Sequence, residues 1–223
     1  MNIKLERFKG YIRGKRVAVL GIGISNTPLI KYLDGIGVDV TAFDRSDEMK
    51  LSENFRRLEG TGARFSLGSG YLEKLRGFDV IFKTPVVRPD IPELLREKER
   101  GAEITSEMEV FLELCPAEIF AVTGSDGKTT TTTLIYEMLR EEGYRCWLGG
   151  NIGTPLLSSI DEMKPEHKVV LELSSFQLQT MKHSPDVAVV TNLSPNHLDI
   201  HKSMEEYVEA KANIFKYQGK QDK

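Results

Sequence analysis

The sequence predicts an α/β protein made of two consecutive doubly wound units, each with a parallel sheet and flanking helices. Short continuous apolar runs, typical of strands buried on both faces of such a sheet, alternate with segments whose apolar residues recur at helical spacing. This strand–turn–helix order starts again after Pro116, so we expect one domain at residues 1–114 and a second at residues 115–223. The predicted strands are residues 16–20, 38–43, 79–82, 119–123, 167–173 and 186–191.

Helices are predicted from the spacing of apolar residues and from the residues that begin and end helices. In the first, Leu29, Ile30 and Leu33 recur at helical spacing, and Gly37 ends the helix. In the last, Ser203 and Glu206 are placed to form a capping box at the N-terminus. The predicted helices are residues 27–36, 91–100, 105–114, 128–142 and 204–217.

Composition and charge exclude several classes of protein. The 40% apolar and 28% charged residues are typical of a globular domain, and the net charge of -3 gives no basic excess for nucleic acid. Residues 1–16 lack the apolar core of a signal peptide, and the longest apolar runs are strand-sized. Cys115 and Cys146 have no metal-ligand spacing and are expected as buried thiols in a reducing compartment. We expect a cytoplasmic monomer with no nucleic-acid or membrane partner.

A glycine turn follows the first predicted strand. Gly21 and Gly23 open the next helix, and Asp44 ends the second strand, which places backbone N–H groups, a helix N-terminus and a carboxylate as in a dinucleotide fingerprint. Asn26 stands where the third glycine of that fingerprint is expected. Three interpretations stay open: a redox dinucleotide, a tight turn without a ligand, and another diphosphate ligand such as a nucleotide-sugar, which we favour.

The second glycine turn has the chemistry of a phosphate-binding loop. Gly124 and Gly127 let backbone N–H groups surround phosphate oxygens, Lys128 can reach the β- and γ-phosphates, and the Thr129 hydroxyl can bind Mg²⁺. The spacing between the glycines is shorter than in the usual P-loop, so this is a variant. An accidental Gly-Lys-Thr is the alternative, but the strand before and the helix after favour ATP. The expected ATP contacts are Gly124, Ser125, Asp126, Gly127, Lys128, Thr129 and Thr130.

Two further residues have an environment that suggests metal chemistry. Glu172 ends an apolar strand, where it either holds Mg²⁺ near the glycine turn or is a solvated strand-end acid. Lys211 lies on the apolar stripe of the last helix, and burying an unpaired ammonium costs several kcal/mol, roughly. Its side chain therefore either extends to water along its stem or loses its proton and takes up CO2 as a carbamate.

His197 directly follows the end of the last predicted strand. A lone histidine there is usually a hydrogen-bonding loop residue, but beside a Mg-ATP site it can contact metal or substrate. The other histidines, His167, His183 and His201, show no comparable context and are expected at the surface.

Together these segments resemble the Mur ligase family. The segment from Glu172 to Leu178 is the most discriminating, since sister ligases have other residues after the glutamate. The matching stretches run the length of the chain and are residues 17–25, 124–130, 149–153, 172–178, 192–199 and 210–211.

The resemblance implies an ATP-dependent, amide-forming ligase of peptidoglycan precursor synthesis. In that reaction the carboxylate of UDP-N-acetylmuramoyl-L-alanine attacks the γ-phosphate of ATP, and the amine of D-glutamate then attacks the resulting acyl phosphate. The implied cofactors are ATP and Mg²⁺. The implied fold is a Rossmann-like N-terminal domain that binds the UDP-sugar, followed by an incomplete P-loop α/β ATP-binding domain.

The resemblance also implies roles for individual residues. Lys128, His197 and Lys211 would be catalytic, with Lys128 neutralising the γ-phosphate. Thr129 and Glu172 would hold one Mg²⁺, and His197 with carbamoylated Lys211 would serve a second. The implied UDP-sugar contacts are Ile24, Ser25, Asp44, Arg45, Thr84, Asn151 and His197, with Asn151 on the muramoyl portion.

The length of the chain leads to one more expectation. Members of the family continue into a third domain that binds the incoming amino acid, so we expect this chain to lack the C-terminal part and not to complete the ligation alone. Two alternatives remain open. One is another ligase of the superfamily, either a sister Mur enzyme or a folylpolyglutamate synthetase, and the other is a non-catalytic nucleotide-binding module that regulates a partner.

Overall fold

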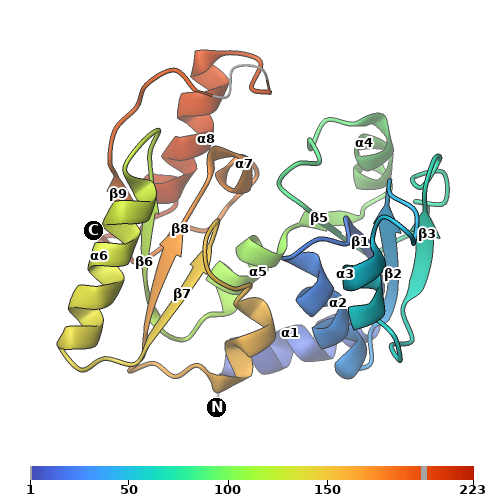
Figure 1. Ribbon diagram of the computed structural model, residues 1–223, viewed down its shortest axis with the longest axis horizontal. Coiled ribbons are helices and arrows are strands. Elements are labelled where there is room, and N and C mark those ends of the chain that lie inside the picture. Colours follow the sequence, from blue (N-terminus) through green and yellow to red (C-terminus); the bar gives the residue numbers. More distant parts are fainter. Residues whose placement is uncertain (1, 197–199) are drawn as a thin grey trace. The chain divides into compact units, whose positions relative to one another are not determined.

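The computed structural model describes residues 2–196 and 200–223, which form an α/β protein with two parallel sheets (Figure 1). The chain divides into two compact units, Met1–Glu107 and Met108–Lys223. The predicted boundary after residue 114 falls at the end of helix α5 (Glu107–Leu114), whereas the units divide at its start. The Glu109 carboxylate of this helix accepts a hydrogen bond from the Lys182 backbone N–H at 3.0 Å, which ties α5 to the second unit.

The first unit contains a five-stranded parallel sheet in the order β3-β2-β1-β4-β5. This is the strand order of a Rossmann-type sheet, and it confirms the predicted α/β class. The central strand β1 lies between β2 and β4, so the strand order reverses there and the carboxyl ends of these strands form a switch point where ligands bind in such folds. The strands are β1 (Arg16–Leu20), β2 (Asp39–Asp44), β3 (Arg64–Leu67), β4 (Val80–Lys83) and β5 (Glu103–Thr105).

Both faces of this sheet are covered, which explains the continuous apolar runs. Ala18 and Leu20 pack in a cluster with Leu94 of helix α4 on one face. Because successive strand residues point to opposite faces, Val17 and Val19 face the other side, and they are fully buried as well. The helices of this unit are α1 (Ile3–Arg13), α2 (Asn26–Gly35), α3 (Ser52–Arg57) and α4 (Pro92–Glu99).

The second unit contains a four-stranded parallel sheet in the order β7-β8-β6-β9. Its register pairs Val122 of β6 with Glu172 of β8, and Glu172 with Gly150 of β7, so the acid ends its strand between two neighbours. The strands are β6 (Glu118–Thr123), β7 (Cys146–Gly150), β8 (Lys168–Glu172) and β9 (Val187–Val190). The helices are α5, α6 (Lys128–Glu141), the 3-10 helix η1 (Leu157–Glu162), α7 (Ser175–Leu178) and α8 (Met204–Lys216).

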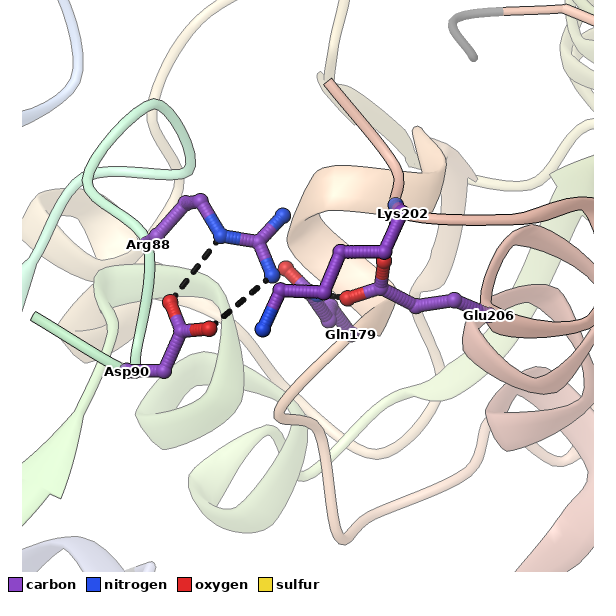
Figure 2. A network of polar contacts seen from close by, with 5 residues as sticks. All are labelled: Arg88, Asp90, Gln179, Lys202 and Glu206. Carbon is purple, nitrogen blue, oxygen red and sulfur yellow. Dashed lines mark hydrogen bonds and ion pairs between the residues drawn. The ribbon is translucent and has the colours of Figure 1, made fainter. Parts of the chain in front are cut away.

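Helix α8 begins where the sequence predicts it. The Ser203 side chain accepts from the Glu206 backbone N–H at 3.2 Å, which confirms the serine part of the predicted cap. The Glu206 carboxylate accepts from the Lys202 backbone N–H and from the Gln179 side-chain amide, the latter at 2.8 Å (Figure 2). Since Gln179 directly follows α7, this bond joins α7 to the first turn of α8.

None of the helices formed by residues 2–196 and 200–223 is long and apolar enough to cross a bilayer.

His167 is buried, so its predicted surface position is wrong. Its side chain is only 5% exposed, and its Nδ1 atom accepts from the Trp147 indole N–H at 3.2 Å and from the Lys164 backbone N–H at 3.3 Å. Burial lowers the pKa of the imidazole below its ordinary value, and the nearby Arg145 acts in the same direction. The partner that explains this burial belongs to β7, which lies 20 residues away in the sequence.

The end of β7 passes very close to the end of β8. Gly150 has a φ of +95°, and a Cβ atom there would lie 2.1 Å from the backbone oxygen of Glu172. Only glycine has room at this position and readily adopts this conformation. The close approach lets the Asn151 backbone N–H donate to the Glu172 carbonyl at 2.7 Å, so Gly150 brings Asn151 beside Glu172.

We expect Gly150→Ala to lower the free energy of unfolding of the second unit by about 3–5 kcal/mol, because left-handed strain and a backbone clash add. Gly143→Ala is the matched control, since Gly143 also has a positive φ of +89° but has open space around it, and it should cost about 1–2 kcal/mol. Urea unfolding followed by the emission of Trp147, the only tryptophan, measures both. Equal losses would contradict the crowding at Gly150.

We also expect the second unit to lose stability as the pH falls below about 6.5, the ordinary pKa of histidine. The folded state lowers the pKa of His167, so the unfolded chain binds the proton first and stability declines with decreasing pH. In His167→Asn, an amide oxygen can still accept from Trp147 and the group does not titrate. Unfolding measured between pH 7.5 and 5.5 should therefore decline less in the variant; an identical decline in both proteins would rule out His167 as a source.

Candidate functional site

A cavity of about 500 Å³ lies at the carboxyl ends of β1, β2 and β4 in the first unit. Of the residues predicted to bind a UDP-sugar, Asp44, Arg45 and Thr84 line it, whereas Ile24 and Ser25 lie outside its lining. Its position at the switch point of the sheet is where a Rossmann-type fold binds ligands. The lining residues are Gly21, Asp44, Arg45, Tyr71, Leu72, Thr84, Val86, Val87, Arg88, Ile91, Pro92 and Glu93.

The Asp44 carboxylate fixes the glycine turn that borders this cavity. One oxygen accepts from the Ile22 backbone N–H at 2.7 Å, and the other accepts from the Ser46 backbone N–H at 2.8 Å. An ionised carboxylate has about four lone-pair sites, so acceptor capacity remains for a ligand hydroxyl. Asp44 therefore shapes the turn as well as lining the cavity.

Asn26 explains why the turn does not need a third glycine. Its side chain is 2% exposed, and its amide donates to the carbonyls of Leu20 and Gly21 at 3.0 and 3.1 Å. The amide thus satisfies backbone groups that the sharp turn would otherwise leave without partners. A polar residue in place of the glycine is the signal in the sequence that could have revealed this role.

Thr84 offers an unused polar atom at the wall of the cavity. Its Oγ1 atom is buried and has no hydrogen-bond partner within the described part of the chain. The Gly21 turn packs against it, since a Cβ atom at Gly21 would lie 2.7 Å from the Thr84 methyl carbon. A buried hydroxyl without a partner costs free energy unless a bound group satisfies it, so Thr84 fits a ligand-binding role.

Arg88 is a lining residue that sequence reasoning missed. Its guanidinium forms a two-point ion pair with Asp90, with N–O distances of 2.9 and 3.2 Å (Figure 2). Together with Arg45 it places two guanidinium groups at the cavity. Guanidinium groups bind phosphate oxygens well, so the lining suits an anionic ligand such as a diphosphate.

The glycine turn of the second unit is built around two unusual backbone positions. Gly124 has a φ of +152°, and a Cβ atom there would lie 1.9 Å from the Thr191 hydroxyl oxygen, so only glycine fits. Gly127 is the N-cap of α6 with a φ of +77°, and it has open space around it. The N-terminus of this 14-residue helix therefore faces an accessible site for phosphate oxygens.

The segment that follows β9 holds this turn in place. The Asn192 carbonyl accepts from the Ser125 backbone N–H, and the Asn192 side chain both accepts from and donates to the Asp126 backbone, each at 3.0 Å. The Thr191 hydroxyl donates to the Asp126 carbonyl at 2.6 Å. These contacts were not predicted individually, because they join residues more than 60 positions apart.

Lys128 and Lys211 converge on the same backbone oxygen. The Lys128 ammonium donates to the carbonyls of Gly124 and Ser125 at 2.9 and 2.8 Å, and the Lys211 ammonium donates to the Gly124 carbonyl at 2.7 Å. Lys211 is 3% exposed, so the alternative of a side chain extended to water is wrong. Burial, followed by the charge of Lys128, lowers the pKa of Lys211 to about 8.

Glu172 forms the centre of a second polar cluster at the same end of the sheet. One carboxylate oxygen accepts from the Thr129 hydroxyl at 2.6 Å, and the other accepts from the Asn151 amide at 2.8 Å. The side chain is 1% exposed, so the alternative of a solvated strand-end acid is wrong. Within the described residues, no three or more histidine, cysteine or acidic side chains are grouped so that they could hold a metal ion by themselves. A hydroxyl and one carboxylate are the kind of oxygen donors that Mg²⁺ uses together with phosphates and water.

Among the predicted histidines, His201 differs from expectation and His197 is not tested. His197 lies outside the described residues. His201 was expected at the surface, but it is 2% exposed, its Nε2 atom lies 2.9 Å from the Ser175 hydroxyl, and its ring stacks on Phe176 at 4.9 Å. The Ser175 hydroxyl and the Phe176 ring, which belong to α7, explain why His201 is buried.

Comparison with known proteins gives the family. Residues 122–223 match the profile described as Mur ligase middle domain. The UDP-N-acetylmuramoylalanine–D-glutamate ligase of Acetivibrio thermocellus is 68% identical over 223 residues, which is 100% of this chain and 48% of that relative. The chain belongs to the Mur ligase family. The ligases of the same name from Ruminiclostridium cellulolyticum and Clostridium botulinum (strain Hall) are 65% and 61% identical, covering 100% and 98% of this Mur-family chain. It spans about half the length of these relatives, 48% in each case.

Two solved structures share the fold of this Mur-family chain. The UDP-N-acetylmuramate-alanine ligase of Thermotoga maritima is 26% identical with a TM-score of 0.51, covering 90% of this chain and 46% of that one. The UDP-N-acetylmuramate:L-alanyl-γ-D-glutamyl-meso-diaminopimelate ligase of Neisseria meningitides is 20% identical with a TM-score of 0.58, covering 93% and 69%. The second likeness concerns the fold alone.

In this Mur-family chain we expect Asp44→Asn to destabilise the first unit by about 2 kcal/mol. The amide of the variant keeps one acceptor oxygen, but its NH2 group would face a backbone N–H that now donates to the carboxylate. Hydrogen bonds to a charged acceptor contribute about 1.5–3 kcal/mol, so losing one should be measurable. Asp47→Asn is the control, because Asp47 accepts one backbone N–H at 3.0 Å in an exposed position. Thermal unfolding measures both variants. If the two lose the same stability, Asp44 does not fix the turn.

Proposed function

We propose that the protein to which this chain belongs is an ATP-dependent ligase that joins D-glutamate to UDP-N-acetylmuramoyl-L-alanine in peptidoglycan precursor synthesis. The observation that carries this proposal is that two polar clusters lie at the second glycine turn. Lys128 and Lys211 both donate to the Gly124 carbonyl, and Thr129 donates to Glu172. The 68% identity to a ligase of that name supports the choice of substrates.

The residues of the second unit are proposed to bind and orient the triphosphate. Backbone N–H groups from Gly124 to Thr130, with the N-terminus of α6, would surround the phosphate oxygens. Lys128 would leave the loop carbonyls to which it donates and neutralise the charge that develops on the γ-phosphate as the substrate carboxylate attacks it. The resulting acyl phosphate would react with the amine of D-glutamate, and phosphate would leave as the amide forms.

Magnesium fits the donors that this unit offers. When bound, Mg²⁺ would neutralise phosphate charge. Thr129 and Glu172 would hold it, because a hydroxyl and a buried carboxylate already lie 2.6 Å apart at the start of α6. Lys211, as a carbamate, and His197 are proposed for a second ion. Carbamate formation joins the neutral amine to CO2 and releases one proton, and the lowered pKa of Lys211 favours it.

The UDP-sugar is proposed to occupy the cavity of the first unit. Arg45 and Arg88 would bind the diphosphate, and Asp44 and Thr84 would accept or donate hydrogen bonds to the uridine portion. Ile24 and Ser25 remain proposed contacts at the adjoining turn. Asn151, whose amide donates to Glu172, is proposed to contact the muramoyl portion.

We also propose a cellular compartment and an oligomeric state for the protein. Cys115 and Cys146 are free, and both are half-buried rather than fully buried as predicted. Free thiols support the cytoplasm, where reductants keep them reduced. The protein is also proposed to act as a monomer. The D-glutamate site is proposed to lie in the part of the relatives that this chain does not span.

Calorimetry of the chain with two ligands tests the proposal. We expect Lys128→Ala to weaken the binding of Mg-ATP at least about tenfold, because the lysine is the main cation of the loop, and to leave the binding of UDP-N-acetylmuramoyl-L-alanine unchanged. Lys182→Ala, which removes an exposed lysine of the same unit, is the control and should change neither.

Comparison ligands separate the alternatives. Tight binding of NAD in preference to the UDP-sugar would overturn the function proposed for the first unit. In the complete ligase that contains this chain, Lys128→Ala should abolish turnover with D-glutamate, and unchanged turnover would exclude the mechanism. Turnover with another amino acid in place of D-glutamate would instead point to a sister ligase, and nucleotide binding without turnover would point to a regulatory module.

Carbamate formation at Lys211 can be observed directly. In ¹³C-bicarbonate we expect a carbamate carbon signal that grows as the pH rises through about 8, where about half of an amine with this pKa is neutral. Lys211→Gln should remove the signal, whereas Lys216→Gln, which changes an exposed lysine on the same helix, should retain it. A signal that survives in Lys211→Gln would exclude this residue as the site.

A further inference from the structure

Tyr207 of α8 reaches the glycine turn of the second unit and has no role in the reaction described above. Its side chain is 1% exposed, and its hydroxyl lies 2.9 Å from the Ser125 hydroxyl in a buried contact. Ser125 is itself only 4% exposed. Two buried hydroxyl groups from segments 82 residues apart are therefore bonded directly to each other.

The surroundings of Ser125 determine the direction of this hydrogen bond. The Ser125 hydroxyl donates to the Ser194 carbonyl and accepts from the Ser194 backbone N–H, both at 2.8 Å. A serine hydroxyl has one proton and two acceptor sites. Since its proton is used for the carbonyl, the Tyr207 hydroxyl must donate, and Ser125 then has all of its hydrogen-bonding capacity satisfied.

The ring of Tyr207 has a second set of contacts. The Lys211 ammonium lies 4.7 Å from the ring centroid, a distance at which the face of an aromatic ring attracts a cation. The His201 ring packs edge-on at 5.4 Å. Tyr207 and Lys211 are four residues apart, so they share one face of the helix. They bond to the neighbouring residues Ser125 and Gly124, which gives α8 two attachment points on the turn.

We propose that Tyr207 is a positioning residue for triphosphate binding, which holds the Ser125 hydroxyl so that the turn and the Lys211 helix keep one geometry. This inference rests on the proposed function of the turn. Binding phosphate requires several backbone N–H groups to point at one place, and a turn that is already ordered loses less conformational entropy on binding. The tyrosine hydroxyl contributes to that order without touching the nucleotide.

Calorimetry with Mg-ATP tests the role of the hydroxyl. Tyr207→Phe keeps the ring beside Lys211 and removes only the donor, so it should weaken Mg-ATP binding by about three- to tenfold, the range expected for one buried hydrogen bond. Binding of the UDP-sugar should be unchanged. Tyr217→Phe is the matched control, because Tyr217 follows the same helix and is 46% exposed, and it should bind Mg-ATP like the parent.

A double-mutant cycle shows whether Tyr207 acts through Ser125. If the two hydroxyl groups act through one bond, Tyr207→Phe combined with Ser125→Ala should bind Mg-ATP no more weakly than Ser125→Ala alone. Amide hydrogen exchange supplies a measurement that needs no nucleotide. In Tyr207→Phe, exchange should accelerate at residues 124–128 and stay unchanged in β1 and β2 of the first unit.

The outcomes distinguish this inference from the proposed function. A parent chain that fails to bind Mg-ATP would overturn the proposed function of the turn, and the exchange measurement would still decide whether Tyr207 orders it. A parent that binds Mg-ATP while Tyr207→Phe binds equally well would overturn the role of Tyr207 alone. Additive effects of the two substitutions, or exchange unchanged at residues 124–128, would overturn it as well.

Discussion

The carbonyl oxygen of Gly124 accepts hydrogen bonds from two lysines, and much of the second unit serves to hold it there. Lys128 reaches it from the first turn of α6 and Lys211 from the middle of α8. Two ammonium groups at one oxygen repel each other. The hydrogen bonds that each makes to backbone carbonyls offset the free-energy cost of that repulsion. An incoming polyanion would relieve that repulsion, and so would loss of the Lys211 proton in the proposed carbamate.

Close packing of the surrounding chain keeps the Gly124 turn in this position. Thr191 leaves no space for a side chain at Gly124, and the backbone of Glu172 leaves none at Gly150. Parallel pairing of β6 with β8 and β9 then brings Glu172, Thr191 and the glycine turn to one edge of the sheet. In the first unit the same rule applies, since Gly21 packs on Thr84 where β1 and β4 end. Both candidate sites thus arise where parallel strands end beside a glycine.

The sequence predicts the parts of the fold that have a strong local signal. Buried strands such as Arg16–Leu20 and Glu118–Thr123 are continuous apolar runs, and α6 and α8 have clear beginnings. Helix α1, the short helices α3 and α7, and strands β3, β5 and β7 were not predicted. Strand β7 consists of Cys-Trp-Leu-Gly-Gly. From sequence alone its two glycines indicate a turn, and only the structure shows that Gly150 allows the backbone of β8 to pass close by.

Residues of the candidate sites could be predicted where a local sequence pattern indicates one kind of chemistry. Glycine, lysine and threonine next to one another indicate phosphate, and a lysine on an apolar stripe indicates burial, so Lys128 and Lys211 could be found from sequence. The supporting contacts could not be found, because they depend on tertiary structure. Nothing local distinguishes Asn192, Tyr207 or Arg88 from ordinary loop, core and surface residues, and the burial of His167 depends on Trp147 of another strand.

The glycines at the end of β7 have a consequence for interpreting genetic variation. Gly150 and Gly153 both have positive φ angles, and a Cβ atom at Gly153 would lie 2.6 Å from the Leu148 carbonyl oxygen. In a survey of substitutions these positions would score as intolerant as Lys128, although neither supplies a side chain to any ligand. Sensitivity to substitution alone would then misassign these glycines as catalytic residues. Measuring folding stability alongside turnover distinguishes them, because a glycine variant loses its fold whereas a Lys128 variant loses a charge.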